Sequence, residues 1–194
     1  IYTEAFPPAA PVEGRKDAGG HLAAVRDQLT ARLAERDIPA ADQILGDALV
    51  SSTPEDLILE VITPAFSRIG QLWEEGKLTV ATEHLVTNYL RQRLLMWMLS
   101  GPPPRTSKPI VLACAPDEWH EGSLLIMGAL LRRRRWPVAY LGQSLPLADL
   151  ASFVRDLQPR LVVTVAMTET SAGRLIEWPQ YLPDAAKDGR PVIG

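Results

Sequence analysis

The sequence predicts a four-helix bundle followed by an α/β domain with a doubly wound parallel sheet. Residues 21–100 carry apolar side chains at helical spacing together with signals for helix ends. Residues 108–194 alternate short apolar runs with helical segments, which is the pattern of a parallel sheet covered on both faces. The proline-rich segment 101–107 is typical of an interdomain linker, and residues 1–20 have the composition of a linker or tail.

Four helices are predicted before the linker, over residues 21–35, 40–50, 54–75 and 80–100. Thr53 and Thr79 can cap the third and fourth of them, because a threonine hydroxyl accepts a hydrogen bond from a free amide of the first turn. Pro64 lies inside the third helix and predicts a kink there, since proline has no amide hydrogen to donate. Gly76 marks the end of that helix.

Strands are predicted over residues 110–115, 138–141, 161–166 and 192–193, with helices over 121–134 and 146–157 between them. Each strand is a continuous apolar run, as expected where helices cover both faces of the sheet. Ligands of open α/β sheets bind beyond the carboxyl ends of the strands. The loops that follow these strands therefore hold the candidate site.

Composition excludes several classes of function. The 194 residues contain 20 Lys and Arg against 23 Asp and Glu, and the net charge of −3 lacks the basic excess of a self-sufficient DNA-binding domain. The single cysteine, Cys114, excludes an internal disulfide or a multi-cysteine metal site and favours a cytoplasmic location. No apolar run reaches the roughly 20 residues of a membrane span, so we expect a soluble protein. The chain lacks an initial methionine and stops after a strand-like run, so we expect it to be truncated at both ends.

The loop after the first strand places a histidine, His120, between the acidic residues Glu118 and Glu121. A carboxylate can fix the tautomer of a metal-binding imidazole and raise its basicity. No second histidine or cysteine accompanies His120 in this loop, which disfavours a zinc site made by protein ligands alone. The pattern favours a metal that arrives inside a macrocycle. The alternative is a solvated histidine at the start of a helix.

Glu118, Trp119 and His120 resemble the E/D-x-H core of the cobalamin-binding domain, which has a flavodoxin-like or Rossmann-like fold. In that family the histidine replaces the dimethylbenzimidazole base beneath cobalt, and the acid hydrogen-bonds the histidine. The resemblance implies a corrinoid cofactor with His120 as its metal ligand. Asp117, which precedes Glu118, and Trp119, which lies between Glu118 and His120, are candidate cofactor contacts.

Further candidate contacts follow the second and third strands. Gly142 and Ser144, after the second strand, and Thr164, near the end of the third, lie where the cobalamin-binding family surrounds the nucleotide tail. Hydroxyl residues in such turns also commonly satisfy backbone groups, so a structural role stays open. The fuller family motif has a glycine three residues after the histidine, where this chain has Ser123. This departure disfavours the methyl-transferring members.

A second resemblance lies in the bundle. Nine residues separate Trp73 from Glu83 and His84, which is similar to the W-x9-EH motif of CarH-type, adenosylcobalamin-dependent light sensors. There the tryptophan covers the upper axial group, and the Glu-His pair lies near the adenosyl group. Val80, in the same helix as the pair, is included among the cofactor contacts. Ordinary core packing for the tryptophan, and a surface pair for the other two residues, are the alternatives.

The resemblance to this family implies a regulator and not an enzyme. Photolysis of adenosylcobalamin would change a homo-oligomer, a tetramer in the dark, which contacts DNA through a missing N-terminal domain. Light sensors of this type often carry a cobalt-capturing histidine after the tryptophan, where this chain has Glu74. Either His84 substitutes for it, or the light product is ligated otherwise, or the sensor works differently.

Three other functions remain open from the sequence. The chain could be a corrinoid carrier subunit of a methyltransferase system, which shares the fold and His120. It could be a photosensor that pairs cobalamin with a bilin as second chromophore. It could also be a flavodoxin-like regulatory domain without a corrinoid, although this leaves the bundle unexplained.

Overall fold

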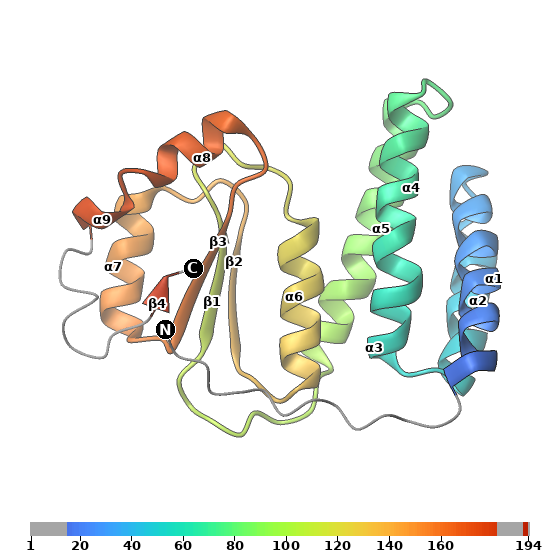
Figure 1. Ribbon diagram of the computed structural model, residues 1–194, viewed down its shortest axis with the longest axis horizontal. Helices are drawn as coiled ribbons and strands as arrows, with labels where there is room; N and C mark the ends of the chain where they lie inside the picture. The colour runs from blue at the N-terminus through green and yellow to red at the C-terminus, as the bar shows by residue number, and fades with distance from the viewer. Residues whose placement is uncertain (1–14, 182–191, 194) are drawn as a thin grey trace.

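The computed structural model describes residues 15–181 and 192–193, and places a helical bundle beside an α/β domain (Figure 1). The bundle consists of α1 (Arg15–Ala34), α2 (Ile38–Ser51), a composite third helix, and α5 (Val80–Leu99). Helix α1 begins at Arg15, inside the segment 1–20 that is predicted to be a linker or tail, and residues 1–14 of that segment lie outside the described residues. The fold class predicted from the sequence is confirmed.

The third helix is continuous but changes its winding before the proline. It contains α3 (Pro54–Leu57), the π-helical turn η1 (Ile58–Ile62) and α4 (Thr63–Glu74). The amide of Thr63 donates to the carbonyl of Ile58, and its hydroxyl contacts the same oxygen at 2.7 Å. Pro64 cannot donate to the preceding turn, so widening that turn accommodates it. The irregularity predicted at Pro64 therefore takes the form of a π turn.

The turn between α4 and α5 has the geometry that its sequence predicts. Gly76 adopts a φ of +71°, which is the left-handed region that glycine enters without steric cost, and its amide donates to the Trp73 carbonyl at 2.9 Å. The Thr79 hydroxyl accepts from the amide of Thr82 at 3.2 Å and caps α5. These contacts bring the end of α4 and the start of α5 together at one end of the bundle.

The sheet is parallel, in the order β2-β1-β3-β4. Its strands are β1 (Ile110–Cys114), β2 (Val138–Gly142), β3 (Leu161–Val165) and β4 (Val192–Ile193), and its helices are α6 (Gly122–Arg133), α7 (Leu147–Leu157), α8 (Glu169–Leu175) and α9 (Trp178–Tyr181). Along β1, Val111 and Ala113 pack toward α7, whereas Leu112 and Cys114 pack toward α6. The strand order reverses between β1 and β3, so the loops that follow these two strands diverge and leave space for a ligand.

Helix α6 joins the two parts of the molecule. Leu125 and Ala129 of α6 belong to the same buried cluster as Leu94 and Met98 of α5. A Cβ at Gly128 would lie 2.6 Å from the Met98 methyl carbon, so glycine there lets α5 approach α6 closely. The bundle and the α/β domain therefore share the buried cluster to which α5 and α6 both contribute. Among the described helices, none is long and apolar enough to cross a membrane.

Replacing Leu125 by alanine tests this shared core. The side chain is fully buried, so we expect the free energy of unfolding in urea to fall by about 2–5 kcal/mol, with one cooperative transition. The exposed Leu99 serves as control, and its replacement by alanine should change the free energy by less than about 0.5 kcal/mol. An equally small effect at Leu125 would contradict the shared core.

Candidate functional site

A buried carboxylate holds an exposed imidazole in the loop after β1. Glu118 is fully buried, and its Oε1 lies 2.6 Å from Nδ1 of His120 and accepts the backbone amide of His120 at 2.9 Å. The His120 side chain is itself 71% exposed. With Nδ1 donating to the carboxylate, Nε2 carries the free lone pair. This arrangement presents one imidazole nitrogen as a ligand and fixes its direction.

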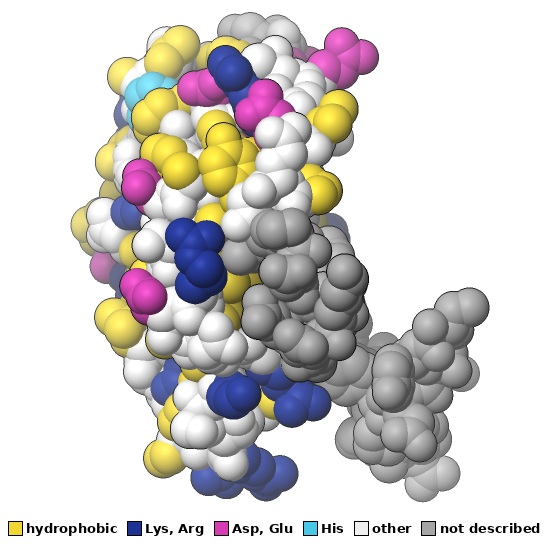
Figure 2. Space-filling view, turned by 90° about the vertical axis from the view of Figure 1, so that its left-hand side faces the viewer, with side chains coloured by type: hydrophobic (Ala, Val, Ile, Leu, Met, Phe, Trp, Pro, Cys, Tyr) yellow, Lys and Arg dark blue, Asp and Glu magenta, His cyan; other side chains and the backbone are white. Residues whose placement is uncertain are grey.

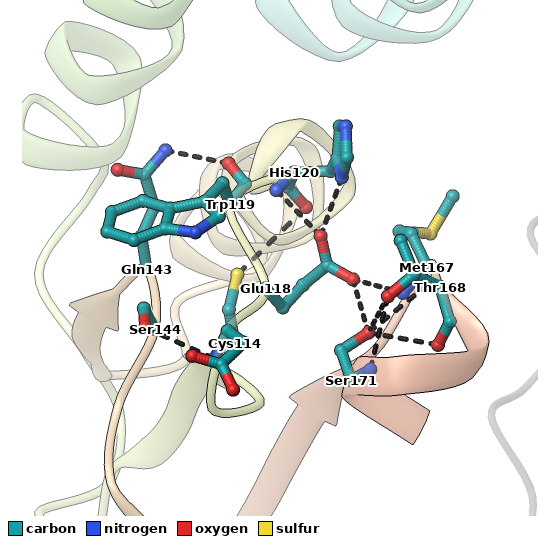
Figure 3. Close-up of polar contacts among 10 residues, drawn as sticks. Cys114, Glu118, Trp119, His120, Gln143, Ser144, Met167, Thr168 and Ser171 are labelled. Atoms are coloured by element: carbon teal, nitrogen blue, oxygen red, sulfur yellow. Dashed lines mark hydrogen bonds and ion pairs between the residues drawn. The ribbon is translucent and has the colours of Figure 1, made fainter. Parts of the chain in front are cut away.

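The second oxygen of Glu118 is held from the loop after β3. It accepts the hydroxyl of Ser171 at 2.7 Å and the backbone amide of Met167 (Figure 3). Ser171 is buried, and with Thr168 it forms the capping box of α8. Glu118 therefore connects the loops on the two sides of the point where the strand order reverses. Sequence reasoning missed Ser171, although a threonine followed three residues later by a serine was a usable capping signal.

Glu118 is ionised in this environment. Burial alone would raise its pKa, but the hydrogen bonds from Ser171, from the His120 and Met167 amides and from the His120 ring together lower the pKa to about 2. An ionised carboxylate beside Nδ1 fixes the tautomer and the orientation of the imidazole. A histidine oriented in this way by an ionised acid is suited to bind a metal.

The loop after β2 also forms hydrogen bonds with the loop that contains His120. The Ser144 hydroxyl accepts the amide of Asp117 at 3.2 Å, and the Ser144 amide donates to the Glu118 carbonyl at 2.9 Å. Gln143 donates to the carbonyl of Trp119 at 2.7 Å. In the described structure the Ser144 hydroxyl thus positions the loop, which is the structural role that the sequence left open.

The remaining candidates of the α/β domain lie around this loop. Trp119 is largely exposed, and the side chain of Asp117 pairs with Arg174 at 3.3 Å. Gly142 ends β2 with a φ of +81°, and Thr164 lies in β3 in register with Ala113. These residues lie on the strand ends and loops next to Glu118.

The bundle candidates gather at the turn between α4 and α5. Trp73 is 46% exposed at the end of α4, and Val80 is exposed at the start of α5. Nδ1 of His84 lies 2.7 Å from Glu83, whose other oxygen accepts the Thr87 hydroxyl at 2.6 Å. Like His120, His84 is thus oriented by a carboxylate and largely exposed.

Both groups lie at the same end of the molecule. Figure 1 places the α4–α5 turn and the loops after β1 and β3 at this upper end. The histidine atoms that are visible on the face drawn in Figure 2 also lie near the upper end. Among the described residues, no hydrogen bond or ion pair joins the bundle group to the His120 group. Nor do three His, Cys, Asp or Glu side chains come together there as a metal cage. A metal on His120 would take its other ligands from a bound group, which a corrinoid ring can provide.

Sequence reasoning did not select a second buried carboxylate beside His120. Glu121 is only 5% exposed, and its two oxygens contact Nε of Arg91 on α5 and the hydroxyl of Tyr140 on β2. Burial and the contact with Glu121 raise the pKa of Tyr140 far above its usual value, so its hydroxyl stays a donor. No local sequence pattern predicts this cluster, because Tyr140 and Arg91 lie 19 and 30 residues from Glu121 along the chain.

Comparison with known proteins supports a corrinoid site. Residues 25–96 match the family model described as B12 binding domain. The HTH-type transcriptional repressor CarH of Myxococcus xanthus is 34% identical over 186 residues, which are 94% of this chain and 62% of CarH. The chain is similar to CarH over most of its length, and its bundle region matches the B12 binding domain model. The resemblance to CarH-type cobalamin-binding modules that the sequence indicated is thereby confirmed.

Two further comparisons find one protein of related sequence and one of the same fold. The HTH-type transcriptional repressor CarA of the same organism is 33% identical over 121 residues, which are 61% of this chain and 41% of CarA. The monomethylamine corrinoid protein of Methanosarcina barkeri has the same fold, with a TM-score of 0.67, 12% identity, and coverage of 88% of this chain and 82% of that protein. The chain thus spans less than two thirds of both curated relatives. The family match covers the bundle candidates but not His120, whose role depends on its geometry.

Acid stability tests the state of Glu118. Because its pKa is lowered from 4.5 to about 2, Glu118 stabilises the fold above pH 4.5, and this contribution is lost as the pH falls toward 2. Glu118→Gln should remove this part of the pH dependence and cost about 1–3 kcal/mol at neutral pH, because an amide cannot accept from every donor. Unfolding of the cofactor-free chain in urea between pH 2 and 7 measures both effects. The exposed Glu169→Gln is the control, and an equal pH dependence in both variants would contradict the assignment.

Proposed function

We propose that the chain binds cobalamin between the bundle and the α/β domain, with Nε2 of His120 as the lower ligand of cobalt. The observation that carries the proposal is the exposed imidazole held at 2.6 Å by a buried carboxylate at the carboxyl ends of the strands. Ser171 and Met167 keep Glu118 ionised and immobile, so His120 is preorganised before a ligand arrives. Gly142, Ser144 and Thr164 would border the nucleotide tail.

The bundle residues would cover the opposite side of the corrin. Trp73 presents an exposed indole that can shield an upper axial group from water, and Val80 is exposed at the start of α5. The Glu83 carboxylate, oriented by its contacts with His84 and Thr87, can accept hydrogen bonds from an adenosyl group. Adenosylcobalamin is therefore the proposed form, and it supplies a cobalt–carbon bond that light can cleave.

The proposed output is a change of assembly. A ligand shifts an equilibrium only when it binds the two states differently, and an upper group contacted by the bundle meets this requirement. Since CarH and CarA are transcriptional repressors, we infer that this module regulates transcription as a light-responsive homo-oligomer, a tetramer in the dark. DNA contact would belong to a part of such proteins that this chain does not span.

A corrinoid carrier for methyl transfer is the second candidate. The fold shared with the monomethylamine corrinoid protein favours it. A carrier must expose its cobalt to partner enzymes, whereas in the proposed arrangement Trp73, Glu83 and His84 would cover it. Ser123, in place of the family's glycine, also disfavours this function.

Absorbance and size-exclusion chromatography with adenosylcobalamin separate the two candidates. In the dark, the purified chain should hold the cofactor and elute as a larger assembly. Green light should change both the absorbance spectrum and the elution volume. Retention of methylcobalamin with methyl transfer, and the same elution volume in light and dark, would instead support the carrier.

Replacing His120 by alanine tests the lower ligand. We expect the absorbance spectrum to change from histidine-ligated to base-off cobalamin, with affinity reduced by at least about tenfold. The remote His21→Ala provides a matched control that should bind like the wild type. An unchanged spectrum in the His120 variant would exclude this residue as the ligand.

Replacing Trp73 by alanine tests the upper cover. Affinity for adenosylcobalamin should fall roughly tenfold, because the indole face would be lost from the upper group. Affinity for hydroxocobalamin, which has a small upper ligand, should change much less and serves as internal control. Equal losses for both forms would show that Trp73 supports the bundle and does not cover the upper group.

A further inference from the structure

Glu121, the residue after His120, connects three elements of the structure. Its carboxylate is buried, and its oxygens contact the Arg91 guanidinium of α5 and the Tyr140 hydroxyl of β2. Its amide donates to the Trp119 carbonyl at 3.1 Å, and its carbonyl accepts the amide of Leu125 at 3.0 Å. Glu121 is therefore fixed through both its side chain and its backbone.

His120 lies between two buried carboxylates that are held from different directions. Glu118 is fastened to the loop after β3, whereas Glu121 is fastened to the bundle through Arg91. A movement of α5 away from α6 must either leave a buried carboxylate without its cation, which is costly, or move the backbone next to His120. The bundle and the His120 loop cannot shift independently.

Helix α5 extends this connection toward the α4–α5 turn. Arg91 follows His84 by seven residues, which is two helical turns, so both lie on the same face of α5, about 10 Å apart along its axis. The helix is unbroken from Val80 to Leu99. A displacement at Glu83 and His84 would therefore reach Glu121 through one rigid element.

We propose that Arg91 and Tyr140 are positioning residues that, through Glu121, couple the bundle to the orientation of His120. The proposal rests on the proposed function of His120 as the cobalt ligand. A change above the corrin, at the start of α5, would alter the lower ligand by way of the Arg91–Glu121 ion pair. The Arg91–Glu121 ion pair would thus couple the two sides of the cofactor through the protein.

Hydrogen exchange of the cofactor-free chain tests the coupling without a corrinoid. Arg91→Met keeps the length of the side chain but removes its charge, and should speed exchange of the Glu121 and Leu125 amides about tenfold. Arg91→Lys should restore most of the protection, and Tyr140→Phe should have a smaller effect in the same direction. Arg32→Met, which breaks an exposed ion pair with Glu35, is the control and should leave these amides unchanged.

Cobalamin binding by the same variants tests the consequence for His120. Arg91→Met should lower the histidine-ligated fraction in the absorbance spectrum and weaken binding about tenfold, with recovery in Arg91→Lys. The proposal would be overturned if the Glu121 and Leu125 amides of Arg91→Met exchanged at the wild-type rate, or if exchange became faster evenly over the whole chain. An unchanged histidine-ligated fraction in Arg91→Met would also overturn it. If the wild-type chain bound no cobalamin, the proposed function would fail, whereas the exchange data would still decide whether Arg91 holds Glu121.

Discussion

The site depends on one buried negative charge. Glu118 lies beneath the surface, yet four hydrogen-bond donors from the loops after β1 and β3 keep it ionised. Its position fixes the tautomer and direction of His120, and it holds the two loops together at the point where the strand order reverses. Removal of this charge would leave a surface histidine with no defined orientation.

The bundle packs against the α/β domain through helix α6. Helix α6 packs into the core of the bundle through Leu125 and Ala129, so the two parts share buried surface and a common stability. Glu121, the residue that precedes α6, contacts Arg91 of the bundle and follows the candidate ligand His120 directly. Packing thus sets how far the bundle lies from His120, and polar contacts set the orientation of the loop.

Local patterns in the sequence were sufficient for the four bundle helices, the four strands, α6, α7 and the pair of Glu118 and His120, but they did not predict α8 or α9. Apolar runs and caps identify helices and strands, and the residues of the pair are only two positions apart. The partners of Glu118 could not be predicted, because Met167 and Ser171 lie 49 and 53 residues away and meet it only through the strand order. The contacts of Glu121 with Arg91 and Tyr140 were missed for the same reason.

Two local features also differed from the simplest expectation. The widening of the third helix before Pro64 distributes the irregularity over a π turn, because the helix stays packed along its whole length. The start of α1 at Arg15 shows that a segment containing glycine can continue a helix despite its low propensity.

The most direct test of the central claim is electron paramagnetic resonance of the chain loaded with cobalamin in the paramagnetic cobalt(II) state. The unpaired electron couples to the nitrogen that binds cobalt from below, which gives a triplet splitting for the common nitrogen isotope. Labelling all histidines with the heavy isotope should convert this triplet to a doublet, and His120→Ala should abolish the conversion while His84→Ala preserves it. A triplet that persists in the labelled wild-type protein would show that the nucleotide base remains on cobalt and that His120 is not its ligand.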